Sequence, residues 1–245
     1  MKILDLEIEN DSYDAILNRI QNNISLNKSF SFSYVNAYVA LFARKDLTLR
    51  NDLNKLSGLY SDGIGMYISS KFLWGKNGLR NRINATDLHY KILDLAQKND
   101  YKVFFFGGGE KAISLLADHI KKHYPNLTVS GIMERNLNFD THIFSEIIST
   151  DSDILFVGLG TPYQEKWIAK FGKKINVPVQ IAVGSWIDFL AGKYNRAPKV
   201  MRIIGLEWLF RLFSEPKRLW KRYLLGIPHF VFLIIKQKLF TKESL

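Results

Sequence analysis

Short apolar runs alternate along the chain with longer stretches whose apolar positions recur at the helical period. The runs that end in Asn, Asp or Gly are typical of buried strands, and they occupy residues 29–35, 58–61, 102–106, 153–157 and 177–183. The clearest helical stretch follows the third run, from Glu110 to about Lys122. This alternation predicts βα units around a mostly parallel sheet, which is a Rossmann-like α/β fold flanked by helices.

The carboxyl ends of the predicted strands carry the candidate ligand contacts. In open parallel sheets, loops and helix N-termini meet at this edge, and ligands bind there. We therefore expect one rim shared by Asn36, Asp62, Gly107, Gly160 and Gly184. Taken alone, Asp62 has a simpler explanation, because Asp-Gly is a common turn pair.

The pattern changes after Pro198. Residues 207–213 and 216–225 mix cations with large aromatic side chains, and residues 230–235 are strongly apolar. This change predicts an α/β domain over residues 1–198 and a basic, aromatic-rich helical appendage over residues 199–245.

Composition narrows the functional classes. With 245 residues and 47% hydrophobic content, the chain can bury the core of one α/β domain. It has no cysteine, which excludes disulfides, thiolate metal sites and a cysteine nucleophile. The five histidines lack the spacing of metal ligands. Charges interrupt the N-terminal apolar run too early for a signal peptide, so we expect a cytoplasmic location.

Positive charge is concentrated at the C-terminal end. The formal net charge is +11, and residues 199–245 hold ten Lys and Arg against three Asp and Glu. Such a segment could bind nucleic acid, lie on an anionic bilayer, or pack as an ordinary core with a charged outer face. The apolar run 223–235 falls short of the roughly 20 residues that span a bilayer, and it is more apolar than nucleic-acid binding needs. We therefore expect peripheral membrane association and no nucleic acid.

Two motifs resemble known patterns of cofactor and metal binding. The turn from Gly107 to Ala112 fits the G-x-G-x-x-A pattern of dinucleotide sites, with Glu134 at a spacing suited to a ribose contact. Any βα turn favours glycine, so contact with a phosphate is better supported than a nicotinamide or flavin. Asp151 and Asp153 imitate the D-x-D metal clamp of sugar-nucleotide transferases. They precede their strand, away from the rim, which favours a turn and predicts no metal site.

Several segments, in a fixed order along the chain, carry a family resemblance. They are Ser61 to Gly65 (SDGIG), Arg82 to Leu88 (RINATDL), Val103 to Gly109 (VFFFGGG), Gly158 to Ile168 (GLGTPYQEKWI), Gly184 to Pro198, and Gly205 to Tyr223. Together they resemble the WecG/TagA/CpsF family of bacterial glycosyltransferases over most of the chain, from about residue 34 to residue 223. Ala85 and Ser185 stand where glycine is usual in that family, which bears on the shape of the sugar pocket.

The resemblance implies an inverting glycosyltransferase of cell-envelope polysaccharide synthesis. The donor would be a UDP-sugar, typically UDP-N-acetylmannosamine or its uronic acid, and the acceptor N-acetylglucosamine or another sugar on undecaprenyl diphosphate. No obligatory metal or other cofactor is implied. The expected location is the cytoplasmic face of the plasma membrane, and the apolar C-terminal surfaces could also support a homo-oligomer. A basic nucleic-acid-binding module and a dinucleotide-dependent oxidoreductase are the alternative functions.

Roles for individual residues follow as hypotheses. The attacking acceptor hydroxyl needs a general base, and Asp62 is the candidate. Charge on the departing diphosphate would be met by arginines and helix N-termini. The expected substrate contacts are Asn36, Arg82, Asp87, Gly107, Gly108, Gly160, Gln164, Gly184 and Asp188. The expected contacts to the lipid diphosphate and the membrane are Arg211, Arg218 and Arg222, which share one face if they lie on one helix.

Overall fold

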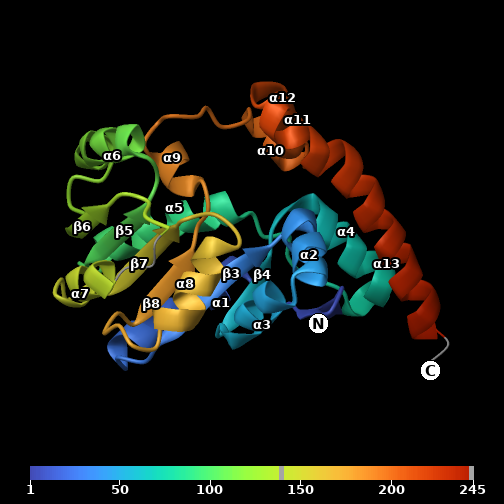
Figure 1. The fold of residues 1–245 in the computed structure, drawn as a ribbon, viewed down its shortest axis with the longest axis horizontal. Coiled ribbons are helices and arrows are strands. Elements are labelled where there is room, and N and C mark those ends of the chain that lie inside the picture. The colour runs from blue at the N-terminus through green and yellow to red at the C-terminus, as the bar shows by residue number, and fades with distance from the viewer. Residues whose placement is uncertain (138–140, 243–245) are drawn as a thin grey trace.

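A six-stranded, all-parallel sheet forms the centre of the computed structural model, which describes residues 1–137 and 141–242 (Figure 1). The strand order is β4-β3-β8-β7-β5-β6, and a two-stranded antiparallel hairpin, β1-β2, lies beside it. The strands are β1 (Lys2–Ile3), β2 (Leu6–Glu7), β3 (Phe30–Val35), β4 (Gly58–Ser61), β5 (Val103–Gly107), β6 (Val129–Met133), β7 (Ile154–Gly158) and β8 (Val179–Ala182). The five expected strands and the α/β fold class are confirmed.

Helices connect and cover these strands. Those of the α/β body are α1 (Tyr13–Ser25), α2 (Ala37–Lys45), α3 (Leu47–Lys55), α4 (Gly63–Trp74), η1 (Gly75–Asn77), α5 (Ala85–Lys98), α6 (Glu110–His123), α7 (Thr141–Ile148), α8 (Tyr163–Phe171) and α9 (Trp186–Leu190). Those of the C-terminal segment are α10 (Lys199–Ile203), α11 (Glu207–Ser214), α12 (Pro216–Trp220), the π-helical turn η2 (Lys221–Leu225) and α13 (Gly226–Lys242).

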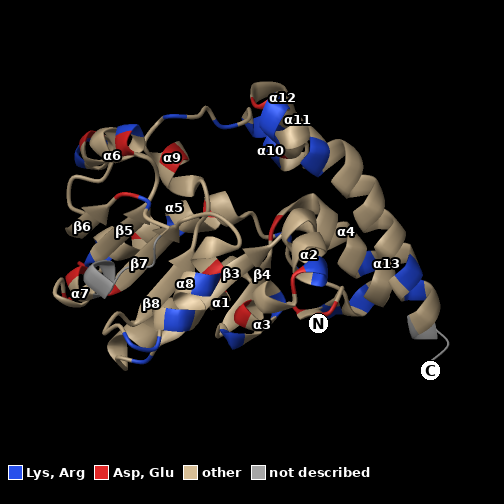
Figure 2. Ribbon diagram, in the orientation of Figure 1, with Lys and Arg blue, Asp and Glu red and all other residues tan. Residues whose placement is uncertain are grey.

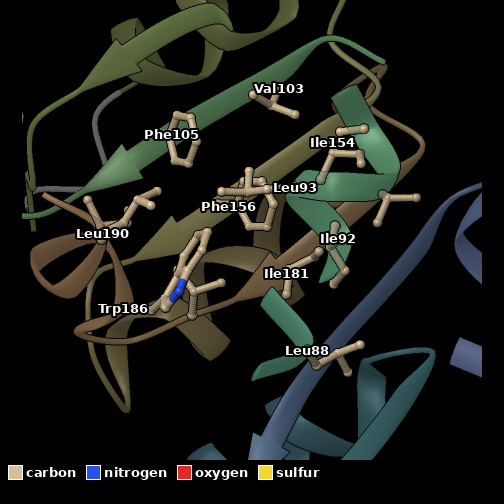
Figure 3. Close-up of a cluster of buried hydrophobic side chains, with 14 of the residues drawn as sticks. Leu88, Ile92, Leu93, Val103, Phe105, Ile154, Phe156, Ile181, Trp186 and Leu190 are labelled. Carbon is tan, nitrogen blue, oxygen red and sulfur yellow. The ribbon is translucent and has the colours of Figure 1, made fainter. Parts of the chain in front are cut away.

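Alternating strand residues build two separate hydrophobic layers. Phe105, Phe156 and Ile181 face one side of the sheet, where side chains of α5 and α9 pack on them (Figure 3). Residues of α1 and α6 complete this layer. Phe104 and Phe106 face the other side and pack with side chains of α7 and α8. Because both faces are covered, the strands read as continuous apolar runs, which is why they could be recognised in the sequence.

The ends of β5 and β7 approach each other unusually closely. A Cβ atom on Gly107 would lie 2.5 Å from the carbonyl carbon of Gly158, and Gly107 has a φ of +140°. Only glycine fits this position without moving the backbone. The two turns that follow these strands therefore open side by side at the same edge of the sheet.

The C-terminal segment crosses above the strand ends and then returns along the body (Figure 1). Helix α13 packs against α2 and α4, and its Phe230, Leu233 and Ile234 belong to the same buried cluster as the β1-β2 hairpin. The Gln237 side chain accepts a hydrogen bond from the Leu4 N–H at 3.0 Å. The division of the chain at residue 198 stays a prediction, but α13 shares a core with the body.

The prediction that the C-terminal apolar segment is too short to span a bilayer is wrong. The helix from Pro216 to Phe240 runs through 25 residues and is long and apolar enough to cross a bilayer. The helix is longer than the apolar run 223–235, because Gly226 and Pro228 do not interrupt it. Only 22% of its most apolar 18-residue window is buried. The length of the helix is therefore compatible both with a helix that spans the bilayer and with one that lies on its surface. The packing of α13 against α2 and α4 distinguishes the two.

Candidate active site

A cavity of about 600 Å³ opens at the carboxyl edge of the sheet. The turns after β3, β4, β5, β7 and β8 form its base, and residues of α9, α11, α12 and η2 close it from the other side. Most of the predicted site residues line it: Asn36, Asp62, Gly108, Gly160, Gln164, Gly184, Asp188, Arg211, Arg218 and Arg222. Gly107 lies directly beside Gly108, at the end of β5.

Asp62 occupies the first turn after β4 and is held by two neighbours. Its Oδ1 accepts a hydrogen bond from the Ala85 N–H at 3.1 Å, and its Oδ2 lies 3.5 Å from the Asn36 Nδ2. Asn36 itself caps α2, because its Oδ1 accepts the Val39 N–H at 3.1 Å. Asp62 is the N-cap residue of α4 by position, yet its side chain makes no capping bond to that helix. The carboxylate is thus directed to the cavity and not used by its own turn.

The glycine-rich turn after β5 leads into α6 without a capping side chain. Gly109 is the N-cap residue of this 14-residue helix, and no side chain accepts its first N–H groups. These N–H groups are suited to an anion. Arg135, which follows β6, lines the cavity here, and its backbone N–H donates to the Gly108 carbonyl at 3.0 Å. Within the described part of the chain, its guanidinium has no hydrogen-bond or ion-pair partner.

Arg135 is the main cavity residue that sequence reasoning missed. It comes two residues after β6, so the rule that ligands bind at the carboxyl ends of strands applies to it. The strand itself was not predicted, because its residues Val-Ser-Gly-Ile-Met carry no clear alternation and are only half-buried at the sheet edge.

The C-terminal arginines reach the cavity from two helices, Arg211 from α11 and both Arg218 and Arg222 from the continuous helix Pro216–Phe240, so the three do not share one helix face. Arg211 donates to the Ser185 Oγ at 3.3 Å and stacks on Phe189, and Arg218 forms two hydrogen bonds with Glu215. The Arg222 guanidinium lies 4.6 Å from the ring centre of Tyr38. Burial lowers the pKa of Arg222, while the nearby Asp62 carboxylate acts in the opposite direction. Figure 2 shows that some cations of this segment lie around α10, α11 and α12, while others lie toward the far end of α13.

A second acid and cation pair lies in the same cavity. Asp188, on α9, forms a salt bridge of 3.1 Å with Lys193, and both line the cavity. The hydrogen bond from Lys193 to Asp188 is the main cause that raises the pKa of Lys193. Asp188 is therefore held beside the Gly184 turn, where it can accept a further hydrogen bond.

Three aromatic side chains form a buried part of the cavity wall: Tyr34, His89 and Trp186. The His89 ring centre lies 4.9 Å from that of Tyr34 and 4.8 Å from that of Trp186. Burial lowers the pKa of His89 to about 3, so its imidazole is neutral at physiological pH. His89 therefore provides no charge to the site.

Arg82 and Asp87 lie outside this cavity, in a smaller hollow of about 300 Å³. Arg82 donates to the backbone carbonyls of Arg202 and Ile203 at 2.5 and 2.6 Å. Asp87 forms salt bridges with Arg196 at 2.8 Å and with Arg202 at 3.4 Å. In this structure both residues fasten the start of the C-terminal segment to the body. Their predicted substrate contacts are not tested by this geometry and stay predictions.

The remaining motifs lie away from the cavity. Asp151 and Asp153 precede β7, at the amino end of the sheet, where Asp153 accepts the Lys102 N–H at 2.7 Å. The interpretation of this pair as a turn is confirmed. Among residues 1–137 and 141–242, no group of three or more His, Asp or Glu side chains is arranged to hold a metal. Glu134, the residue suggested for a dinucleotide ribose, is exposed and does not line the cavity.

Comparison with known proteins decides the family. The profile of the Glycosyl transferase WecG/TagA/CpsF family matches residues 1–244. The chain belongs to this family. The protein is therefore a glycosyltransferase, and the resemblance drawn from the motifs is confirmed.

Several relatives carry the same name, N-acetylglucosaminyldiphosphoundecaprenol N-acetyl-beta-D-mannosaminyltransferase. The protein from Bacillus subtilis (strain 168) is 31% identical over 206 residues, which cover 84% of this chain and 79% of the relative. That from Bacillus spizizenii is 31% identical and covers 76% of this chain and 71% of the relative. That from Staphylococcus aureus (strain MW2) is 27% identical over 99% of this chain and 94% of the relative. This glycosyltransferase of the WecG/TagA/CpsF family is thus similar along its whole length to mannosaminyltransferases.

Proposed function

We propose that the protein transfers a sugar, N-acetylmannosamine or a related hexose or uronic acid, from a UDP-sugar to a sugar carried on a polyprenyl diphosphate. The names of the relatives support the acceptor class and suggest the transferred sugar. The observation that carries the proposal is the position of Asp62. Its carboxylate is held on one side of a large polar cavity, and three arginines enter the same cavity from the C-terminal segment.

The reaction that fits this arrangement is a single displacement with inversion. The acceptor hydroxyl oxygen attacks the anomeric carbon while the bond from that carbon to the UDP oxygen breaks. Asp62 accepts the hydroxyl proton, and the bonding electron pair leaves with the diphosphate. Asn36 and the Ala85 N–H hold the carboxylate in place, so no reorganisation is needed when the proton moves.

The departing diphosphate is met by cations and free backbone N–H groups. Arg135 and the uncapped start of α6 are placed for the donor phosphates, at the turn after β5. Arg211 and Arg222 line the cavity from the C-terminal segment, along which the acceptor and its diphosphate would enter. Arginine suits both tasks, because its guanidinium can bind phosphate oxygens in a bidentate manner.

A panel of UDP-sugars tests this function. UDP release should depend on both one particular donor and a short-chain lipid-diphosphate acceptor that carries N-acetylglucosamine. If no donor in the panel gives acceptor-dependent UDP release in the presence of vesicles, the proposed reaction is wrong.

We further propose that the enzyme lies on the cytoplasmic surface of the membrane, with α13 in the interface. One side of α13 is buried against α2 and α4, while Phe232, Leu239 and Phe240 on this helix are exposed. A helix that keeps this packing cannot cross a bilayer, but it can insert its outer side among lipid headgroups. Lys236, which is exposed on the same helix, favours an anionic surface.

Vesicle sedimentation tests the membrane proposal. Phe232→Glu and Phe240→Glu together should lower the bound fraction on anionic vesicles by at least about tenfold. Each change removes apolar area that would be buried in the lipid and adds a negative charge that the anionic surface repels. Binding should also weaken with salt. Unchanged binding of the double variant would show that α13 is not the membrane contact.

A further inference from the structure

Gln164 and Glu165 are two adjacent polar residues buried beneath the cavity. Gln164 is 5% exposed, and Glu165 is fully buried. Both belong to the first turn of α8, between the ends of β3, β7 and β8. Burial of a charged carboxyl group is costly unless hydrogen bonds compensate for it, so the partners of Glu165 are important.

The orientation of the Gln164 carboxamide follows from its neighbours. Its Oε1 accepts the Gly184 N–H at 2.8 Å and the Gly160 N–H at 3.2 Å. Its Nε2 donates to the Glu165 Oε1 at 2.8 Å. The reverse orientation would place an NH₂ group against two backbone donors, so the partners select this one. Gln164 thus uses its amide on the protein itself, where we expected a contact to a sugar or phosphate.

Glu165 holds the Nε2 side of the Gln164 carboxamide. Its Oε1 also accepts the Ser33 Oγ–H at 3.0 Å and the Thr161 Oγ1–H at 3.1 Å. The carboxylate therefore joins β3, the turn after β7 and Gln164. Burial raises the pKa of Glu165, and these three hydrogen bonds act against that shift.

The two glycines that Gln164 holds form the cavity rim. Gly160 and Gly184 both have positive φ, at +79° and +56°, a conformation that favours glycine, and the Gln164 Oε1 bridges the N–H groups of these two turns. Each turn continues into residues that line the cavity, Thr161 after Gly160 and Ser185 after Gly184. Gly158, two residues before Gly160, lies close to both Gly107 and Gly184, so a shift of either turn would move the wall beside the glycine-rich turn proposed for the donor phosphates.

We propose that Glu165 is a positioning residue, which orients the Gln164 carboxamide so that its carbonyl oxygen holds the Gly160 and Gly184 turns at the donor side of the cavity. This inference rests on the proposed function for the identity of the donor. The hydrogen-bond geometry itself does not depend on that function.

Four variants separate orientation from simple packing. Glu165→Leu removes the acceptor of the Gln164 Nε2–H, whereas Glu165→Gln retains a carbonyl oxygen in its place. Gln164→Glu puts two carboxylates in contact. The double variant Gln164→Glu with Glu165→Gln has one carboxylate again, with the amide donor and its acceptor exchanged, and the hydroxyls of Ser33 and Thr161 can rotate to suit it.

Donor and acceptor kinetics provide the first measurement. Glu165→Leu and Gln164→Glu should each raise the KM for the UDP-sugar by about tenfold or more, with the KM for the acceptor within about twofold of wild type. Glu165→Gln and the double variant should recover most of the donor KM. Melting temperatures are measured in parallel to confirm that each variant is folded. Equal donor KM values in Glu165→Leu and Glu165→Gln, or no recovery in the double variant, would overturn the inference.

Amide hydrogen exchange provides a second measurement that needs no substrate. Peptides that contain Gly160 and Gly184 should exchange faster in Glu165→Leu than in wild type, and at the wild-type rate in Glu165→Gln. Unchanged exchange in Glu165→Leu would contradict the inference even if the transferase reaction is confirmed. Faster exchange in that variant would support it even if no UDP-sugar proved to be a donor.

Discussion

Replacement of Asp62 by asparagine separates the chemistry of this residue from its structural contacts. The Asp62→Asn side chain would keep the oxygen that accepts the Ala85 N–H, at 3.1 Å in the wild type. Its new NH₂ group would face the Asn36 Nδ2, 3.5 Å from the present Oδ2. Asn36 cannot turn its oxygen toward this group without losing the cap of α2, which is worth about 1 kcal/mol. We therefore expect a loss of unfolding free energy of about 1 kcal/mol or less.

The expected loss of activity is much larger. A positioned general base contributes about 10² to 10⁴ in rate, or about 3 to 5 kcal/mol of activation free energy. The kcat for acceptor-dependent UDP release should fall by that factor in Asp62→Asn. The matched control is the exchange of the two side chains, Asn36→Asp with Asp62→Asn. It restores the hydrogen bond between them and the cap of α2, but it moves the carboxylate away from the reacting hydroxyl.

Urea unfolding and UDP release, measured on wild type and both variants, complete this test. The exchanged variant should regain stability while its kcat stays low. If it regains activity to within about fivefold of wild type, or if Asp62→Asn alone keeps near-normal turnover, the assignment of Asp62 as the base is wrong.

Three other changes test separate parts of the molecule. Arg135→Ala should raise the KM for the donor by about 10- to 100-fold, the value of a charge-assisted hydrogen bond. Lys173→Ala, on the exposed surface, should leave the donor KM unchanged. Equal donor KM values for these two variants would show that Arg135 is not in the donor site. Gly107→Ala should cost about 3 kcal/mol and lower Tm by roughly 6–12 °C, because its Cβ would meet backbone at 2.5 Å. Gly109→Ala, with nothing within 4 Å, should cost about 1 kcal/mol or less, from the loss of glycine at the N-cap of α6; similar Tm values for both variants would contradict the packing at Gly107. Burial holds the pKa of His89 near 3, below its value of 6.5 in the unfolded chain, so the stability that it contributes is present above pH 6.5 and is lost as pH falls. Between pH 7 and pH 5, this residue should lower the unfolding free energy by about 2 kcal/mol. His89→Phe should lack that part of the pH dependence.

Most of the sheet could be predicted, because its strands are buried on both faces and therefore appear as short apolar runs. Strand β6 could not, since it lies at the sheet edge with its residues half-buried and with Gly131 packed under the Phe104 ring. The rim of Asn36, Asp62 and the glycine turns followed from the rule for parallel strand ends.

The contacts that the sequence did not reveal are those between distant segments. Nothing in the local pattern shows that Arg82 would bind the carbonyls of Arg202 and Ile203, or that Arg222 would stack on Tyr38. Likewise, the orientation of Gln164 depends on glycine N–H groups from two separate strand ends. Such pairings are fixed by tertiary packing, which spacing along the chain does not encode.

The most direct test of the central claim is the product itself. The lipid-linked acceptor is incubated with wild-type enzyme and UDP-N-acetylmannosamine, and the product is analysed by mass spectrometry and by NMR of the new anomeric centre. We predict an acceptor that has gained one sugar, with the anomeric configuration opposite to that of the donor. A product of retained configuration, or hydrolysis of the donor with no gain of mass on the acceptor, would contradict it.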